Sequence, residues 1–471
     1  MRFRLLLSLP LLALAACKVG PDYQRPHSAM ADDWLEPAST APVSADWWRQ
    51  FGDPQLTALV ERALASSPDI RQAKARIAEA RAMREAAQGG QMPLVTMTRD
   101  TSFNRISENG QFPVSKIPGF DPEFPLIDSG FDASWEVDTW GRASREVERA
   151  RAMEQVAEWA RRDAVVSLTA EVARTYVDFR LAQEQLATAR TEQDAAAKLA
   201  ELADMRARAG EGSRLEAEQA TAQREASSAA LAQAEADVAA AAYRLAALVG
   251  TPPEQLVPDL LASSGPVPTA PDSIASGIRS DLLERRPDIR RAEMELAAAT
   301  AGIGVAKADL YPRFTLQGSI GLQAQSLDDL VTGESLRYLA GGFFRWPLFN
   351  FGRVRAQIRA ADAKADGAAA SYEAAIVKAL SESEGAANRF AASARSGTNA
   401  ASSLEREDRA FTLARLLFDK GETNRLQLEQ ARLRLAQSQR QDAQARAGKA
   451  GAAIALYKAL GGAWQGEGEG K

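Results

Sequence analysis

The sequence predicts an α+β membrane protein that is built from two copies of one structural unit. Three observations lead to this fold class: a repeat with a constant offset, four short stretches of alternating apolar and polar residues, and helical runs of unusual length. Each copy has a helical run, a Pro, two alternating stretches, Gly-Arg, a very long helical run, a Gly turn and a return helix. Recurrence of the whole order indicates an internal two-fold repeat of structure.

The repeat keeps its register over most of its length. One constant offset relates Trp135 to Trp346, Gly141-Arg142 to Gly352-Arg353, Gly210 to Gly421, and Gly250 to Gly461. A second, slightly larger offset relates residues 68–71 to 287–290 (Pro-Asp-Ile-Arg in both), and Pro93 to Pro312. The change of offset predicts a longer loop between Pro93 and Trp135 in the first copy.

The alternating stretches predict four membrane-crossing strands, at about 94–104, 129–139, 313–323 and 338–348. In the second stretch, Phe131, Ala133, Trp135 and Val137 share one face, and polar residues occupy the other. A strand with one apolar and one polar face is typical of a transmembrane barrel, with lipid outside and water inside. About 10 residues suffice for a tilted strand to cross a bilayer. A half-solvated soluble hairpin would show the same alternation and remains the alternative.

Four strands predict an oligomer. The smallest transmembrane barrels need about eight strands, and open sheet edges do not occur in lipid. The chain must therefore complete its barrel with further copies.

The first 16 residues predict a secretory signal, with two arginines before a short apolar run and small residues after it. Cys17 follows and is the only cysteine, which excludes an intrachain disulfide. Leu14-Ala15-Ala16-Cys17 resembles the bacterial lipobox, whose cysteine becomes an N-palmitoyl and S-diacylglycerol cysteine. An unmodified cysteine in a plain signal peptide is the alternative. Lys18 replaces the Asp that would favour the inner membrane, so we expect the outer membrane.

A lipidated, extended N-terminal segment and an equatorial region are expected over 17–60, and the first repeat is expected over 61–250. Its long helical run after Gly141 contains no Pro or Gly before Gly210. About 68 helical residues at a rise of 1.5 Å would form a rod of roughly 100 Å. A turn at about 210–213 and a return helix complete this copy. Frequent Ala on several helix faces favours close packing on both sides, as in a cylinder of helices.

A Pro-rich stretch predicts a linker over 251–280, and the second repeat is expected over 281–461 with its turn at about 421–424. The Gly- and Glu-rich tail over 462–471 is expected to be disordered.

Composition and motifs argue against nucleic-acid binding and against catalysis. The net charge is −5, and acidic and basic residues alternate along the helices. His27 is the only histidine, so no Ser-His or Cys-His arrangement and no clustered metal ligands are expected. Gly302-Ile303-Gly304 with Lys307 lies within a helical run, which favours close packing over a phosphate loop. We predict no enzyme activity, no cofactor and no metal.

Several motifs together resemble the lipoprotein branch of the outer membrane factor family, the NodT/OprM-type relatives of TolC. The motifs are Cys-Lys-Val-Gly-Pro-Asp-Tyr from Cys17, Trp47-Trp48 with Phe-Gly-Asp from Phe51, residues 286–293, Tyr311-Pro312, and residues 347–353. They cover nearly the whole mature chain.

The resemblance implies a homotrimer with one 12-stranded β-barrel, four strands per chain, continuous with a long periplasmic α-helical barrel. It implies an outer membrane channel that serves as the passive exit duct of a tripartite efflux pump. This duct would conduct small toxic compounds to the exterior. Its partners would be a periplasmic adaptor and an RND-type inner-membrane transporter. A duct for type I protein secretion is one alternative. A periplasm-spanning structural lipoprotein without a pore is another, but it would have no use for alternating strands.

The resemblance also suggests where the pore closes. In the family, the helix after the second Gly turn narrows the pore, often with a Leu and with Asp. Counting from Gly421, the gate residues here are Leu426, Gln427 and Gln430. Gln in place of Asp predicts weak ion preference, unless Glu429 or Glu218 lines the constriction instead. Trp135 and Trp346 are expected at the periplasmic membrane interface, where aromatic residues are enriched.

Overall fold

The structure, a computed structural model of the chain, describes residues 18–26, 33–35, 41, 43–107, 110, 117–119, 121–462 and 464. The expected signal peptide, Cys17, His27 and all but two residues of the expected tail lie outside these ranges. Two compact units are present. The sheet unit takes its residues from 1–26, 77–156 and 292–372, and the helical unit from 27–76, 157–291 and 373–471. Each unit therefore draws on both copies of the repeat.

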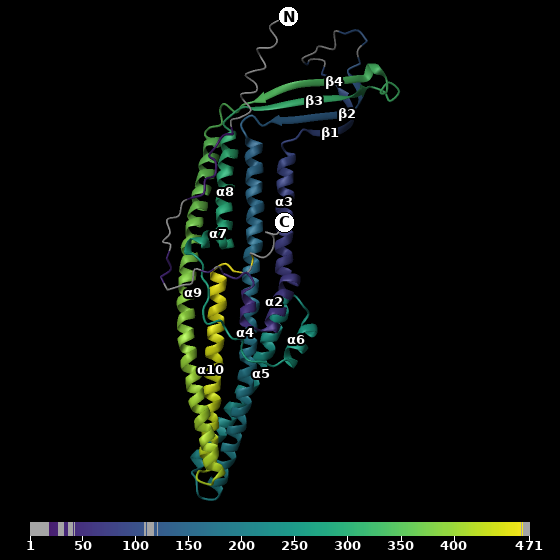
Figure 1. The fold of residues 1–471 in the computed structure, drawn as a ribbon. Coiled ribbons are helices and arrows are strands. Elements are labelled where there is room, and N and C mark those ends of the chain that lie inside the picture. The colour runs from purple at the N-terminus through teal and green to yellow at the C-terminus, as the bar shows by residue number, and fades with distance from the viewer. Residues whose placement is uncertain are drawn as a thin grey trace. The chain divides into compact units, whose positions relative to one another are not determined.

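The sheet unit contains one antiparallel sheet with strand order β1-β2-β3-β4 (Figure 1). Its strands are β1 (Leu94–Arg105), β2 (Glu123–Val137), β3 (Arg313–Ala324) and β4 (Leu336–Arg345). Each strand pairs with the next along the chain, so β1 and β4 are the two edges.

Two strand boundaries differ from the sequence prediction by three residues or more. β2 begins at Glu123, well before the predicted start at 129, and includes Pro125. Proline lacks an amide donor, but β3 pairs with β2 only from Ile127 onward, so this side of Pro125 needs no donor. β4 ends at Arg345 instead of 348, because Trp346 is followed by Pro347, which cannot donate to a strand ladder.

The two faces of the sheet differ in polarity. One face carries the apolar residues Val95, Met97, Phe131, Trp135, Phe314, Leu316, Ile320, Tyr338 and Phe344. The other carries an ion pair between Asp128 and Arg337. There, Gln323 also donates to Asp128 (2.9 Å), and Thr98 donates to Asp132 (2.8 Å). The predicted division into an apolar and a polar face is present, with exceptions on the two edge strands: Leu339 and Phe343 of β4 lie on the polar face, and Arg99 of β1 lies on the apolar face.

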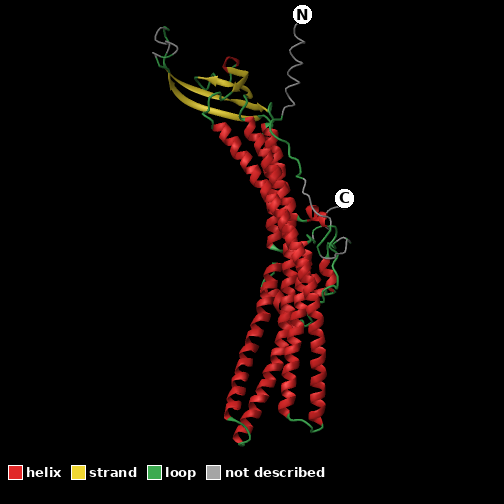
Figure 2. Cartoon of the chain, turned by 90° about the vertical axis from the view of Figure 1, so that its left-hand side faces the viewer, coloured by secondary structure: helices red, strands yellow, loops and turns green. Residues whose placement is uncertain are grey.

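The helices of the chain include two of 67 residues each, shown in red in Figure 2. The elements are α2 (Pro54–Ser66), α3 (Pro68–Gly89), α4 (Arg142–Arg208), α5 (Arg214–Val249), α6 (Pro253–Ala262), α7 (Leu282–Arg285), α8 (Pro287–Ala308), α9 (Arg353–Asp419) and α10 (Arg425–Ala459). Gly367, Gly385 and Gly397 do not interrupt α9. No helix among the described residues is long and apolar enough to cross a membrane.

The expected linker over 251–280 is partly helical. α6 occupies Pro253–Ala262 and buries Leu256, Val257 and Leu260 on one side. Pro253 stands at the start of the helix, where its missing amide proton costs nothing. The sequence analysis did not predict this short helix, because the many prolines of the stretch indicated a linker.

The turns at the ends of α4 and α9 have the same backbone. Gly210 and Gly421 adopt φ values of 73° and 74°, a left-handed conformation that favours glycine. The following amides of Glu211 and Glu422 each donate back to a helix carbonyl at 2.9 Å, which closes both helix ends in the same way. Figure 2 shows each turn as a short loop between long helices.

The core of the helical unit includes the paired tryptophans of the sequence motif. Trp47 is fully buried, and its ring stacks on Tyr457 with centroids 5.0 Å apart. The Tyr457 hydroxyl donates to Gln50 (2.6 Å). Asp53 caps α2, and its second carboxylate oxygen accepts from the Tyr176 hydroxyl (2.9 Å). This motif thus anchors the segment before α2 to α4 and α10.

Candidate functional sites

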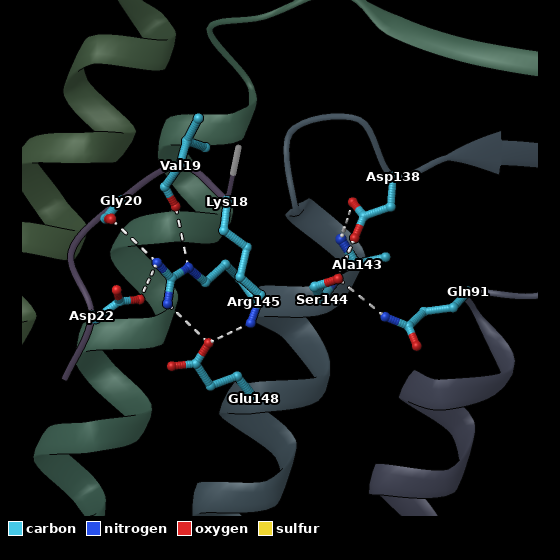
Figure 3. Close-up of polar contacts among 10 residues, drawn as sticks. All are labelled: Lys18, Val19, Gly20, Asp22, Gln91, Asp138, Ala143, Ser144, Arg145 and Glu148. Atoms are coloured by element: carbon cyan, nitrogen blue, oxygen red, sulfur yellow. Dashed lines mark hydrogen bonds and ion pairs between the residues drawn. The ribbon is translucent and has the colours of Figure 1, made fainter. Parts of the chain in front are cut away.

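The first described residues lie against the start of α4, where Arg145 binds them (Figure 3). Its side chain is 1% exposed. Its guanidinium donates to the carbonyl oxygens of Val19 and Gly20, both at 3.2 Å, and Nη2 binds Asp22 Oδ1 at 2.8 Å. Nη1 binds Glu148 Oε2 at 2.9 Å. One buried cation therefore holds residues 19–22, a segment that begins just after Cys17.

Two further contacts hold the same segment, one from a side chain and one from the backbone. Lys18 Nζ binds Glu148 at 3.2 Å, so Glu148 joins Lys18 to Arg145. The Val19 amide donates to the Trp140 carbonyl at 3.1 Å. We call residues 18–22 with Arg145 and Glu148 the N-terminal seat.

Gly304 makes room for the N-terminal seat. A Cβ on Gly20 would lie 2.5 Å from the Gly304 Cα, and a Cβ on Gly304 would lie 2.7 Å from the Arg145 side chain. Gly304 thus serves close packing, as the sequence favours, whereas a Cβ on Gly302 would meet nothing within 4 Å. However, Gly304 packs against the extended segment at Gly20 and against the Arg145 side chain, and not against another helix alone.

Two of the family-like motifs meet at Glu293. Tyr23 donates its hydroxyl to Glu293 at 3.2 Å, and Arg25 Nε lies 3.5 Å from the same oxygen. Burial, together with the nearby Glu293 charge, raises the pKa of Tyr23 well above its ordinary value. The hydroxyl therefore stays a hydrogen-bond donor at neutral pH.

Asp138 fixes the transition from β2 into α4. Its two carboxylate oxygens accept from the amides of Ala143 (2.9 Å) and Ser144 (2.8 Å), and from the Ser144 hydroxyl at 2.6 Å. Gln91, which follows α3, donates to that hydroxyl at 3.4 Å (Figure 3). The strand end and the helix start are thereby held together beside the N-terminal seat.

Trp135 and Trp346 occupy equivalent places in the two copies. Trp135 Nε1 donates to the Gln91 carbonyl at 2.8 Å, and Trp346 Nε1 donates to the Leu310 carbonyl at 3.0 Å. Gln91 and Leu310 are themselves equivalent positions of the repeat, just before the prolines that precede β1 and β3. Each indole thus ties the end of one strand to the turn that begins another. Their place at a membrane interface stays a prediction.

The predicted gate residues begin α10. Asn424 caps this helix by accepting from the Gln427 amide at 3.0 Å, and the Thr423 hydroxyl bonds the Gln427 side chain. Leu426, Gln427 and Gln430 are all exposed. All three residues are therefore accessible from outside the single chain.

Glu429 has a different environment from its neighbours. Arg425 Nε lies 3.1 Å from its carboxylate, so the two residues form an ion pair. Its side chain is 3% exposed, however, so the pair is not confined to the surface. Glu429 is thus buried, whereas Leu426 and Gln430 on the same helix and Glu218 on α5 are exposed.

Arg286, within the family-like motif of residues 286–293, joins three helices of the helical unit. It binds Asp288 of α8 and Glu382 of α9, both at 2.7 Å, and donates to the Ala459 carbonyl at 2.9 Å. Burial alone would raise the pKa of Asp288, but the hydrogen bonds and charge of Arg286 hold this pKa below its ordinary value. These residues line a hollow of about 260 Å³.

The sequence prediction missed Arg145 and the role of Gly304. The repeat itself contained a signal, because both residues break it: Ala356 replaces Arg145, and Glu85 replaces Gly304, in the other copy. Among the described residues, no group of three or more His, Cys, Asp or Glu side chains could hold a metal ion.

Known proteins resemble this chain over nearly its whole length. Residues 59–251 and 278–462 match the family model described as "Outer membrane efflux protein". The chain is 30% identical over 464 residues to the pyoverdine export outer membrane protein OpmQ of Pseudomonas aeruginosa, covering 98% of this chain and 96% of that protein.

Solved structures share the fold. The outer-membrane channel OprN has a TM-score of 0.83 and 33% sequence identity, covering 95% of this chain and 100% of that one. The CmeC outer membrane channel of Campylobacter jejuni has a TM-score of 0.86 with 96% of each chain covered; its 22% identity supports the fold alone. The long helices and four-stranded sheet are therefore the fold of outer-membrane channels, and the predicted fold class is confirmed.

Proposed function

Because this chain belongs to the outer membrane efflux protein family and is an outer-membrane efflux channel, we propose that three copies form the passive exit duct of a tripartite pump. A periplasmic adaptor and an RND-type inner-membrane transporter are the proposed partners. The transporter supplies the energy, so the duct needs no catalytic group, cofactor or metal. The proposed cargo is a class of small toxic compounds.

The observation that carries this proposal is the amphipathic four-stranded sheet with two edges. One face is apolar and exposed, and the other carries the Asp128–Arg337 ion pair. Such a sheet suits lipid on one side and water on the other. In lipid, the edges β1 and β4 must both be paired. Four strands are too few to close a barrel, and three copies supply twelve.

The N-terminal seat supports lipid attachment at Cys17. A cysteine that carries acyl chains must be kept close to the membrane surface. Arg145 binds the residues directly after it, at the junction where β2 passes into α4. We propose that the seat sets the distance between the lipid and the sheet. Trp135 and Trp346, which hydrogen-bond to the turns before β1 and β3, would mark the same membrane interface.

Leu426, Gln427 and Gln430 are proposed to close the pore. Leu426 and Gln430 stand at positions i and i+4 and share one face of α10, and both are exposed on the single chain. Three copies of this face around one axis would join an apolar ring to rings of amides. Amides can close by mutual hydrogen bonds without the repulsion of three carboxylates.

Efflux from cells tests the duct. A deletion strain is expected to retain more of a fluorescent dye and to become sensitive to toxic compounds, and the intact gene restores both. A strain that keeps its resistance but loses a secreted protein would instead identify a protein-secretion duct. Unchanged dye retention and unchanged secretion would refute the duct function.

The mass of the purified protein in detergent tests the assembly. We expect a trimer that forms ion-conducting channels in a planar lipid bilayer. A stable monomer that retains its β-sheet signal would refute the trimeric barrel.

A further inference from the structure

The edges of the sheet and the internal repeat together dictate how neighbouring copies meet. We propose that the seam between β4 of one copy and β1 of the next reproduces the β2–β3 junction within a single chain. Trp346 then lies opposite Met97, Phe344 opposite Arg99, and Phe343 opposite Asp100 of the next copy. The proposal rests on the trimer of the proposed function and goes beyond it by fixing the residue register.

The structure shows that the two hairpins of the chain are equivalent residue by residue. In the first hairpin Leu94 pairs with Ser134. Their equivalents in the second copy of the repeat, Arg313 and Arg345, pair with each other in the second hairpin. The offsets of the sequence repeat therefore hold for strand register.

The β2–β3 junction is where the first copy of the repeat meets the second. Its pairs include Trp135 with Leu316, Ala133 with Gly318, and Asp132 with Ser319. At the seam, a second copy of the repeat meets the first copy of the next chain. At the seam, each β2 residue of these pairs is replaced by its repeat equivalent in or directly after β4, and each β3 residue by its repeat equivalent in β1. The three pairs above then become Trp346 with Met97, Phe344 with Arg99, and Phe343 with Asp100.

Arg99 supports this register independently. It lies in the middle of β1 on the apolar face of the sheet, because it pairs with Ser129 between the Met97–Phe131 and Thr101–Ile127 pairs. It has no ion-pair partner among the described residues. The proposed register places the aromatic ring of Phe344, itself well exposed, directly opposite it. An Arg side chain can bind the face of such a ring.

A second contact at the helix junction follows the same rule. Trp140 stacks on Tyr311 with centroids 4.6 Å apart and donates to the Pro312 carbonyl at 2.8 Å. Its equivalent in the other copy is Phe351, whose side chain is fully exposed although its φ is 49°, an unfavourable value for a bulky residue. The equivalent of Tyr311 is Met92, which is 68% exposed.

We place Phe351 on Met92 of the next copy. A methionine sulfur beside an aromatic ring is a favourable contact, and burial at the seam would account for an exposed aromatic residue with a positive φ. Within one chain, Trp140 covers Tyr311; between chains, Phe351 covers Met92. At each of these two contacts, one within the chain and one between chains, the aromatic residue directly before Gly141 or Gly352 packs against the other copy of the repeat.

Paired cysteines test the register in the full-length protein in outer membranes. Asp100→Cys with Phe343→Cys is expected to yield a covalent trimer on oxidation, because directly opposite residues have Cα atoms about 4.5–5.5 Å apart, within the range for a disulfide. Asp100→Cys with Gly341→Cys, or with Arg345→Cys, shifts the partner to the next position along the same face. These diagonal pairs are about 7–8 Å apart and should remain uncrosslinked.

The equivalent pair within one chain is the matched control. Asp132→Cys with Ser319→Cys is expected to form an intrachain disulfide and no covalent oligomer, which shows that the geometry of this junction permits the bond. If that control reacts and a shifted seam pair crosslinks instead of the 100/343 pair, the register is wrong. A trimer by mass in which none of the seam pairs crosslinks also overturns the register but leaves the duct intact. A monomer by mass contradicts the proposed function itself.

A photoreactive phenylalanine analogue at position 351 tests the helix-junction contact separately. We expect irradiation to join this position to a peptide that contains Met92 of another copy. The same analogue at position 349, which is also exposed, is the control. Capture of Met92 from position 349 and not from 351 would overturn the placement of Phe351, as would capture within the same chain.

Discussion

Replacing Arg145 by Ala should release the N-terminal seat without unfolding the chain. Hydrogen bonds that involve a charged group contribute about 1.5–3 kcal/mol each. Breaking a buried ion pair costs about 3–5 kcal/mol when the remaining charge is left without a partner. Here Asp22 is 83% exposed and can be hydrated, and Glu148 retains Lys18. The loss of docking free energy should therefore stay below the summed contributions of the four hydrogen bonds that Arg145 makes.

We expect Arg145→Ala to weaken docking of residues 18–22 by about 2–4 kcal/mol. At about 1.4 kcal/mol for each factor of ten, the undocked fraction should rise roughly 30- to 700-fold. The Val19 amide, which donates to Trp140, then exchanges faster with solvent. Hydrogen exchange of the peptide that contains residues 18–26, followed by mass spectrometry, measures this change.

Arg149→Ala is the matched control, because Arg149 is half-exposed one turn further along α4 and pairs with Glu146. It should leave exchange of the N-terminal peptide unchanged. Arg145→Lys should have an intermediate effect, since an ammonium cannot reproduce the planar set of donors. Equal exchange in Arg145→Ala and in the unmodified protein would show that Arg145 does not hold the N-terminal seat. So would an equal increase in Arg149→Ala.

Three further changes have defined outcomes. Cys17→Ser should abolish labelling by a clickable fatty acid, and unchanged labelling would exclude this residue as the lipid site. Gln430→Asp should introduce block by a trivalent cation in single-channel recording, because three carboxylates attract multivalent cations; strong block in the unmodified channel would assign the constriction to other acidic residues, such as Glu218. Asp288→Asn should lower the unfolding temperature near neutral pH. Since the pKa of Asp288 is lowered in the folded protein, its stabilisation is present above the unfolded pKa of about 3.9 and is lost as pH falls through the lower folded value. Thermal unfolding at several pH values should show the difference shrinking in acid, and a constant difference would contradict this origin.

The sequence by itself determined the repeat, the fold class and the need for further copies. Alternation places Phe131, Trp135 and Val137 on one face of a strand whatever that strand pairs with, because the period is a local property of the chain. The Gly turns were equally visible, since Gly210 and Gly421 end long runs and both require a left-handed backbone. The sequence also shows that Arg145 and Gly304 depart from the repeat, but it does not show which residues they contact.

Only the tertiary structure decided which distant groups meet. Arg145 binds a segment far earlier in the chain, at Gly20 and Asp22, and no periodicity specifies such a partner. β2 begins at Glu123 because β1 pairs with it that far, and Pro125 is acceptable there because β3 pairs with β2 only from Ile127 onward. Glu429 and Gln430 are adjacent in sequence, yet packing buries one and exposes the other. Local pattern fixes the faces of an element, whereas burial and long-range pairing depend on what packs against each face.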